Sequence, residues 1–166
     1  MNTDTLELTK EFTNSYELME QTAQCVFITG KAGTGKSTLL NYFKTNTNKE
    51  VVVLAPTGVA ALNVGGATLH SFFRLPPRPI HPDEIKAVSQ KKRKLYQQID
   101  AIVIDEVSMV RADLMDVIDR FLRLNGRDRL KPFGGVQMIF IGDLFQLPPV
   151  VSSNEEARLF ATGYRS

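Results

Sequence analysis

The stretch Gly30-Lys31-Ala32-Gly33-Thr34-Gly35-Lys36-Ser37 constrains the fold of this chain more than any other feature of the sequence. It fits the pattern G-x-x-x-x-G-K-[ST], and it lies between an apolar run and a segment of helical character, residues 37 to 44. The glycines let the backbone curl so that its N–H groups point inward, and the helix directs the positive end of its dipole at the same place. The sequence therefore predicts a strand, a phosphate-binding loop and a helix in succession. An ordinary glycine turn before a helix is the alternative, which the flanking segments disfavour.

Four short apolar runs are spread along the chain, with helical or irregular segments between them. They are Val26–Thr29, Val51–Ala55, Ala101–Ile104 and residues 136 to 141. Runs that are rich in valine and isoleucine and apolar on both faces are typical of strands buried on both sides of a mostly parallel sheet. The alternation of strand and helix predicts an α/β fold, a P-loop NTPase domain with helices on both faces of the sheet. Ligands of such folds bind beyond the carboxyl ends of the strands, where we expect the functional residues.

The segments between the runs contain two helical patterns and a proline-rich stretch. An apolar repeat at helical spacing predicts a helix over residues 12 to 24, capped by Thr13 or Asn14. A second repeat, over residues 110 to 121, predicts a helix that ends near Asn125 and Gly126. Residues 74 to 82 contain four prolines and predict an irregular loop that leads into a basic helix.

The length of 166 residues, with 43% hydrophobic residues, fits one globular domain. We expect its core over residues 25 to 151, after the amino-terminal helix, and an incomplete tail over residues 152 to 166. The net charge of +2 excludes a uniformly basic surface, so any contact with a polyanion has to be local. The single cysteine cannot form an internal disulfide, and no apolar run approaches the roughly 20 residues of a membrane span. Without a targeting segment, we expect a cytoplasmic protein of bacterial or viral origin.

The loop predicts binding of the phosphates of a nucleotide together with Mg²⁺. Lys36 would reach the β and γ phosphates, Ser37 would place its hydroxyl on Mg²⁺, and Thr38 would bond another phosphate oxygen. The predicted nucleotide-binding set is Gly30, Lys31, Ala32, Gly33, Thr34, Gly35, Lys36, Ser37 and Thr38.

Polar residues follow two further runs at the points where those strands would end. Asp105 and Glu106 come directly after the third run, where Asp105 would hold Mg²⁺ and Glu106 would orient and deprotonate the attacking water. Gln146 follows the fourth run and is a candidate sensor of the γ phosphate. Solvated turn carboxylates and a structural loop amide are the alternatives. The predicted catalytic residues are Lys36, Glu106 and Gln146, and the predicted metal ligands are Ser37 and Asp105.

These segments together resemble one family of motor proteins. The quoted motifs are the loop of residues 30 to 37, LAPTGVAALN at residues 54 to 63 with TLHSF at 68 to 72, VIDEVSM at 103 to 109 and GDLFQLPPV at 142 to 150. They resemble the PIF (petite integration frequency) family of superfamily 1 DNA helicases, and residues 119 to 137, with PFGG at 132 to 135, resemble the insert that separates this family from the RecD-like helicases. The resemblance implies a RecA-like first motor domain in which the strand before Gln146 lies between the other two site-bearing strands.

The resemblance also implies ATP-driven movement, 5′ to 3′, along single-stranded DNA, in repair, recombination or telomere and genome maintenance. It places Thr57, Gly58, His70 and Phe72 along the DNA strand. A hydroxyl and backbone amides suit a phosphate, and an aromatic ring suits a base. A packing role is the alternative for His70 and Phe72, and we expect Phe73 to belong to the core. We expect the cations at residues 91 to 94 to form a solvated helix face rather than a contact with DNA.

The sequence departs from the family pattern in two places. A glutamine that reads adenine usually precedes the phosphate-binding loop; here residues 9 to 12, TKEF, stand in its place, and Gln21 and Gln24 are candidate substitutes. The resemblance also implies a partner, a second RecA-like domain that contributes an arginine. We expect this second domain to be absent from this chain. A small P-loop kinase that phosphorylates a nucleoside or metabolite, and a non-catalytic ATP-binding module, are the alternative functions.

Overall fold

The structure is a computed structural model that describes residues 9–146, 154, 157–158 and 161. Its principal helices are α1 (Lys10–Gln21), α2 (Lys36–Asn46), α3 (Gly58–Asn63), α4 (Leu69–Phe73), α5 (Gln90–Gln98) and α6 (Ala112–Asn125). Short 3-10 turns are η1 (Pro82–Glu84), η2 (Val107–Met109) and η3 (Pro132–Gly135). In this part of the chain, no helix has the length and apolar character to cross a membrane.

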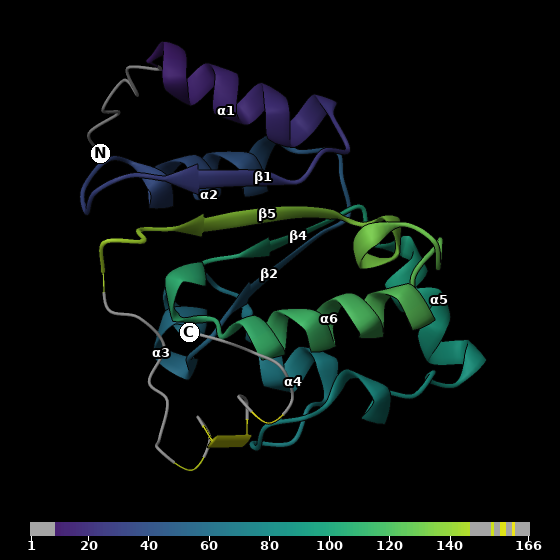
Figure 1. The fold of residues 1–166 in the computed structure, drawn as a ribbon. Helices are drawn as coiled ribbons and strands as arrows, with labels where there is room; N and C mark the ends of the chain where they lie inside the picture. The colour runs from purple at the N-terminus through teal and green to yellow at the C-terminus, as the bar shows by residue number, and fades with distance from the viewer. Residues whose placement is uncertain (1–8, 147–153, 155–156, 159–160, 162–166) are drawn as a thin grey trace.

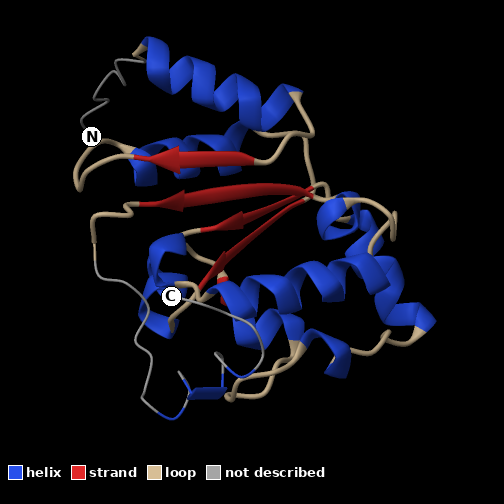
Figure 2. Ribbon diagram, in the orientation of Figure 1, coloured by secondary structure: helices blue, strands red, loops and turns tan. Residues whose placement is uncertain are grey.

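The strands form one parallel sheet of five, in the order β1-β5-β4-β2-β3 (Figures 1 and 2). They are β1 (Val26–Thr29), β2 (Val51–Ala55), β3 (Ala67–Thr68), β4 (Ala101–Ile104) and β5 (Gln137–Gly142). All four predicted runs are strands, and β5 lies between β1 and β4 as the resemblance implied. Strand β3 was not predicted, because two residues are too short to give an alternating pattern.

Each face of the sheet is covered by its own group of helices. Ile102, Ile104 and Met138 point into a core with α4, α5 and α6, whereas Val103, Ile139 and Ile141 point into a core with α1 and α2. This alternation follows from the two-residue period of a strand, and burial on both faces explains why the runs are continuously apolar. The α/β fold with helices on both faces is therefore confirmed.

Helix α1 lies earlier in the chain than predicted. It begins at Lys10, where Thr9 has an extended backbone and its Oγ1 accepts a hydrogen bond of 3.2 Å from the N–H of Phe12. It ends at Gln21, because Thr22 is extended and its hydroxyl bonds to the carbonyl of Leu18. The predicted bounds of 12 to 24, with Thr13 or Asn14 as the cap, were wrong because the apolar repeat marks the packed face and not the cap.

The other helical predictions agree with the structure. Helix α6 ends at Asn125, and the N–H of Gly126 bonds to the carbonyl of Leu122 as the cap. The proline-rich segment is irregular apart from η1, and the basic residues 91 to 94 lie on α5. All strands end at the same edge of the sheet, so the segments that follow β1, β2, β4 and β5 meet there (Figure 2). We call this side the carboxyl edge.

Candidate functional site

The loop between β1 and α2 has the backbone conformation that its glycines allow. Gly33 and Gly35 have φ angles of 80° and 87°, a region that residues with a side chain rarely adopt. Gly35 is also the cap of α2, so the helix starts with free N–H groups facing the loop. The local sequence thus produces the geometry expected of a phosphate-binding loop.

Lys36 lies back across this loop. Its Nζ donates hydrogen bonds of 2.6 Å to the carbonyl of Gly30 and 2.9 Å to the carbonyl of Lys31. Thr34 braces the same turn, because its hydroxyl donates to the carbonyl of Lys31. The ammonium group is held at the mouth of the loop, where phosphate oxygens can replace the carbonyls as its partners.

Asp105 follows β4 directly and is partly buried beside the loop. Its backbone N–H bonds to the carbonyl of Leu54, which fixes the strand end. Burial raises the pKa of its carboxyl group, while the N–H of Glu106 and the charge of Lys36 act in the opposite direction. Asp105 and the phosphate-binding loop thus both lie at the carboxyl edge, on strands that are separated by β5 alone.

The donors here fit a magnesium ion held mainly by its nucleotide. Asp105 and the hydroxyl of Ser37 at the start of α2 are oxygen ligands, the kind that Mg²⁺ prefers. A bound divalent cation would offset the electrostatic cost of burying the charged carboxylate. Among the described residues, no cluster of three or more histidines, cysteines or carboxylates could form an all-protein metal cage. Two protein oxygens complemented by phosphate and water are the usual arrangement for Mg²⁺ in P-loop proteins.

Glu106 has a left-handed backbone conformation, with a φ of 53° and a ψ of 42°. Such a conformation costs a residue with a side chain about 1–2 kcal/mol. The turn that follows packs against the end of β5: a Cβ atom on Gly142 would lie 3.0 Å from Cγ1 of Val107. Glu106 is therefore held in an uncommon conformation by a close approach of two strand ends.

Gln146 lies beyond β5 with an exposed side chain. The register pairs Thr29 with Gly142, so the segment after β5 emerges beside the phosphate-binding loop. The buried Asp143 organises this segment: its Oδ1 accepts a bond from the N–H of Phe145, and its carbonyl accepts one from the N–H of Gln146. The rest of the fourth motif, residues 147 to 150, lies outside the described residues.

A cavity of about 410 Å³ adjoins the loop and extends to the first turns of α1. The loop side of the cavity is lined by Thr29, Gly30, Thr34, Gly35, Lys36 and Thr38, and the α1 side by Thr9, Glu11, Phe12 and Ser15. Residues 9 to 12 thus take the place where the family pattern has its glutamine. Gln21 and Gln24 lie at the other end of α1 and do not line the cavity, so this structure does not support them as substitutes.

Two of the predicted DNA contacts lie where β2 passes into α3. Thr57 is the cap of α3, and its Oγ1 accepts a bond of 3.2 Å from the N–H of Ala60. Gly58 is exposed, and a Cβ atom there would meet nothing within 4 Å. Both residues lie at the carboxyl edge, and the space beside Gly58 is open to a ligand.

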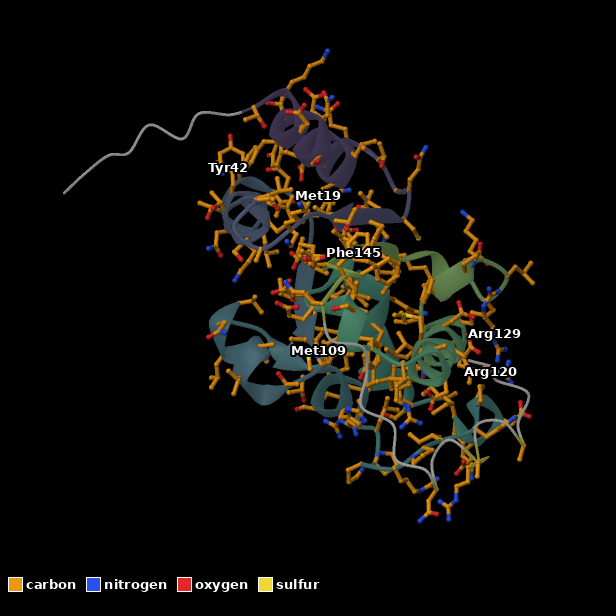
Figure 3. All side chains as sticks on the ribbon, turned by 60° about the vertical axis from the view of Figure 1, so that its left-hand side comes forward. Met19, Tyr42, Met109, Arg120, Arg129 and Phe145 are labelled. Carbon is orange, nitrogen blue, oxygen red and sulfur yellow. The ribbon has the colours of Figure 1, made fainter. Side chains whose placement is uncertain are left out.

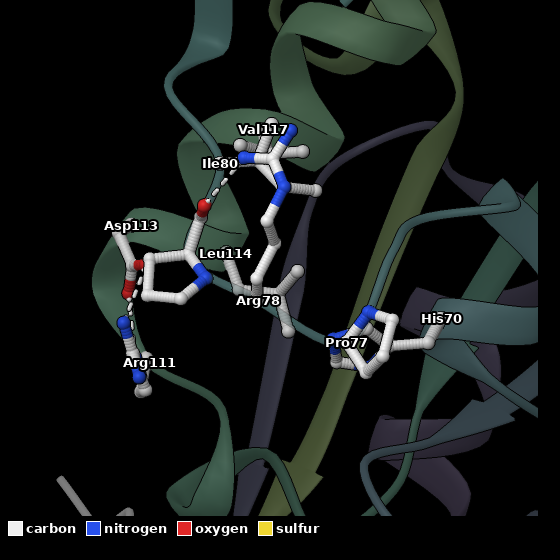
Figure 4. Close-up of a pocket in the computed structure, with 9 residues that line it drawn as sticks. His70, Pro77, Arg78, Ile80, Arg111, Asp113, Leu114 and Val117 are labelled. Carbon is white, nitrogen blue, oxygen red and sulfur yellow. Dashed lines mark hydrogen bonds and ion pairs between the residues drawn. The ribbon is translucent and has the colours of Figure 1, made fainter. Parts of the chain in front are cut away.

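The two predicted contacts on α4 have different surroundings. His70 lines a cavity of about 310 Å³ between the proline-rich segment and the start of α6, where Arg111 and Asp113 form an ion pair of 2.9 Å (Figure 4). Phe72 is partly buried and packs edge-on against Phe73 and Tyr96, with ring centroids 4.9 and 5.7 Å apart. Phe73 is 2% exposed, which confirms it as a core residue.

Large apolar side chains lie exposed at the carboxyl edge. Figure 3, in which this edge comes toward the viewer, shows Met109 and Phe145 there. Phe145 is 96% exposed and Leu62 on α3 is 82% exposed. Apolar side chains this exposed at the mouth of a nucleotide site are typical of a surface that another domain or a ligand covers.

A sequence model of the PIF1-like helicase family matches residues 3–165. The chain belongs to this family. The ATP-dependent DNA helicase PIF1 of Saccharomyces cerevisiae is 41% identical over 166 residues, which cover 93% of this chain and 19% of that protein.

Two solved structures of a Bacteroides Pif1 helicase resemble the fold closely. The protein bound to single-stranded DNA has a TM-score of 0.86 and 44% sequence identity, and the match covers 97% of this chain and 37% of that one. The complex with ADP-AlF4 has a TM-score of 0.87 and the same 44% identity, with 97% and 37% covered. This member of the PIF1-like helicase family thus spans about a fifth of the curated relative and over a third of the solved chains.

Sequence reasoning missed one group of residues in this PIF1-like chain. Glu20, Lys49 and Gln137 meet at the opposite end of α1 from the nucleotide cavity. They stand up to 119 positions from their partners, and no local pattern marks residues that meet only in the folded chain.

Proposed function

We propose that this chain is the ATP-binding motor domain of a DNA helicase that moves 5′ to 3′ along single-stranded DNA. The observation that carries the proposal is that the segments with Lys36, Asp105 and Gln146 follow β1, β4 and β5, which lie side by side in the sheet and end at one edge. Family membership supports it, as do the Bacteroides structures, which are complexes with single-stranded DNA and with ADP-AlF4.

The nucleotide would lie between the loop and α1. The backbone N–H groups of residues 30 to 38 and the ammonium of Lys36 would hold the phosphates, and the base would extend along the cavity toward Thr9 and Phe12. Ser37 and Asp105 would hold Mg²⁺, which neutralises charge on the phosphates when bound.

Hydrolysis would use Glu106 and Gln146 from adjacent strand ends. Glu106 would take a proton from water as the water oxygen attacks the γ phosphorus, and the bond to the bridging oxygen breaks to give ADP and phosphate. Gln146 would contact the γ phosphate and respond to its loss. Because only residues 143 to 145 separate Gln146 from the end of β5, that response would be transmitted to the sheet.

DNA would lie across the same edge, on Thr57 and Gly58 at α3 and on His70 and Phe72 at α4. A second RecA-like domain would cover the exposed Phe145 and close over ATP. This partner would supply an arginine to the developing charge on the γ phosphate, a contribution of about 10³–10⁵ in rate in related phosphoryl-transfer reactions.

Steady-state ATP turnover with and without single-stranded DNA tests the proposal. We would measure it on this chain and on the longer polypeptide of the length seen in the relatives. DNA should stimulate turnover mainly in the longer form, and Lys36→Ala should lower it about 100-fold through loss of phosphate stabilisation. Glu106→Gln should also lower it about 100-fold while leaving ATP affinity near the unmodified value, because only the base is lost.

Two results would contradict the proposal. Transfer of phosphate to a nucleoside or metabolite at a rate above hydrolysis would favour the kinase alternative. Turnover that does not respond to DNA in the longer polypeptide, or ATP binding without any turnover, would favour a module that only binds nucleotide.

A further inference from the structure

A cluster of polar side chains joins the carboxyl-terminal end of α1 to the edge of the sheet at which the strands begin. Lys49, two residues before the start of β2, donates from Nζ to three oxygens. They are the carbonyls of Met19 and Thr22, at 2.6 and 2.7 Å, and Oε1 of Gln137, at 2.6 Å. All three donor hydrogens of the ammonium are therefore used, two of them on carbonyls of the last turn of α1 and of the cap that follows it.

Gln137 and Glu20 complete this cluster, which we call the α1 latch (Glu20, Lys49 and Gln137). Gln137 is 1% exposed at the start of β5, and its Nε2 donates to the carbonyls of Leu18 and Gln24 at 3.3 and 2.9 Å. Glu20 accepts bonds of 2.5 Å from the hydroxyl of Thr47 and 3.2 Å from the N–H of Asn48. The latch thus joins α1 to residues 47–49 before β2 and to β5, which lies between β1 and β4 in the sheet.

The other end of α1 forms one wall of the nucleotide cavity. Thr9, Glu11, Phe12 and Ser15 line that wall, and Phe12 and Tyr16 pack edge-on against Tyr42 of α2, with centroids 5.4 and 5.1 Å apart. Because α2 begins at the phosphate-binding loop, α1 is braced against the loop's own helix along its length and fixed to the sheet at its end. A helix held in this way has a set distance from the loop.

We propose that Lys49, acting through the α1 latch, is a positioning residue for the base of the nucleotide. It sets how far the wall of Thr9 and Phe12 stands from the phosphate-binding loop and has no contact with the phosphates. The inference rests on the proposed function in one respect, namely that the base lies in the cavity between α1 and the loop.

The environment of Lys49 agrees with a positional role. Burial lowers its pKa, while the carboxylates of Glu20 and Asp100 act in the opposite direction. A partly buried charge with all its donors satisfied adds little net stability compared with an apolar residue of similar size, whereas it fixes the geometry of the groups around it. The ammonium donates hydrogen bonds to carbonyls at the end of α1, which an apolar side chain could not do.

The test compares two ligands that share the triphosphate and differ in whether the ribose and base are present. Binding of ATP and of inorganic tripolyphosphate, each with Mg²⁺, would be measured by calorimetry on this chain and on Lys49→Met. We expect Lys49→Met to weaken ATP binding about tenfold and to change tripolyphosphate binding by less than about twofold. General loosening of the fold would weaken both ligands alike.

Matched variants separate positioning from folding. Lys44→Met removes a similar lysine, whose Nζ donates at 2.5 Å to the carbonyl of Val64, outside the latch. It should leave the ratio of the two affinities unchanged. Gln137→Leu should lower ATP affinity in the same direction as Lys49→Met, and Lys49→Arg, which keeps donors for the carbonyls, should restore most of it.

Three results would overturn the proposal. They are an unchanged affinity ratio in folded Lys49→Met, an equal change in Lys44→Met, and a loss in Lys49→Arg as large as in Lys49→Met. If Lys49→Met does not fold, Gln137→Leu decides by the same ratio. A chain without any affinity for either ligand would refute the proposed ATP site itself, whereas equal affinity of the unmodified chain for both ligands would refute only the placing of the base, and with it this inference.

Discussion

Gly142 shows how a single missing side chain can set the position of Glu106, the proposed catalytic base. A Cβ atom there would lie 3.0 Å from Cγ1 of Val107 and 3.2 Å from its backbone nitrogen. These separations are tighter than ordinary contacts, so the turn after Glu106 has to give way by a few tenths of an ångström. Glu106 already has a φ of 53°, which leaves its backbone little freedom to absorb the shift.

We therefore predict that Gly142→Ala lowers the turnover number for ATP about tenfold, because a small misplacement of a reacting group is costly. ATP affinity should stay close to that of the unmodified chain, since the phosphate-binding loop is on another strand. The measurement is kcat and, separately, equilibrium binding of ATP. Val107→Ala in the same chain removes the closest contact and should restore part of the turnover; no recovery would show that the loss has another origin.

The negative charge of Asp105 has opposite effects on the stability of the fold and on the proposed binding of Mg²⁺. Burial raises the pKa of its carboxyl group in the folded chain, so the folded state binds the proton more tightly than the unfolded state. The favourable effect of protonation is present below the pKa of the unfolded chain and is lost as the pH rises through the folded value. At neutral pH the ionised, partly buried carboxylate is thus unfavourable for folding in the absence of a cation.

Asp105→Asn should accordingly increase resistance to urea at neutral pH, and the gain should disappear in acid. The same variant should weaken Mg²⁺-dependent ATP binding at least about tenfold, because a neutral amide replaces a charged ligand. Urea unfolding at several pH values, together with Mg²⁺ titrations, checks both effects. A variant that is less stable than the unmodified chain at neutral pH would contradict the account of the burial.

Helix α4 places two adjacent aromatic residues in different environments, and this sets what each can do. Phe73 is 2% exposed and contacts Phe121, with ring centroids 5.2 Å apart, whereas Phe72 is only partly buried beside Tyr96. The N–H of Ser71 is capped by Thr68, which orients the short helix. A ring that is half in the core and half exposed can contact DNA only through its open side.

Phe72→Leu should weaken binding of single-stranded DNA about fivefold, since it keeps apolar packing and removes a face on which a base stacks. Nucleotide affinity should not change. Fluorescence anisotropy of labelled DNA gives the first quantity and ATP binding the second. Phe73→Leu, a core change of the same chemistry, is the control and should alter thermal stability more than DNA affinity; equal DNA affinity in Phe72→Leu and the unmodified chain would assign Phe72 to packing alone.

The elements that could be predicted from sequence are those whose signal is local. The phosphate-binding loop and the four longer strands carry their signal within a few consecutive residues. Helix α1 was misplaced by about one turn, because Thr9 is recognisable as a cap only through the bond that it makes. The α1 latch and the two-residue strand β3 depend on partners brought together by the whole fold, and the conformation of Glu106 depends on Gly142 in a neighbouring strand.

Charge is distributed unevenly over the molecule although its net value is only +2. Residues 74 to 94 carry seven basic and two acidic side chains, so the remainder of the chain is net acidic. The basic helix α5 lies toward the edge where the strands begin, while α3 and the end of β5 lie at the carboxyl edge (Figure 1). Helix α5 therefore lies toward the opposite side from the proposed ATP site, whereas Arg78 of the same basic stretch lines the cavity beside His70.

This separation predicts a small effect of the lysines of α5 on DNA binding. Each phosphate contact on single-stranded DNA contributes about 0.7 to the slope of log affinity against log salt, so three contacts would contribute about 2. Replacing Lys91, Lys92 and Lys94 by glutamine should leave that slope unchanged and lower affinity by less than about threefold. Anisotropy titrations over a range of salt concentrations measure both. A slope reduced by about 2 would place DNA on α5 and show that the polyanion contact extends around the molecule from the carboxyl edge to the opposite side.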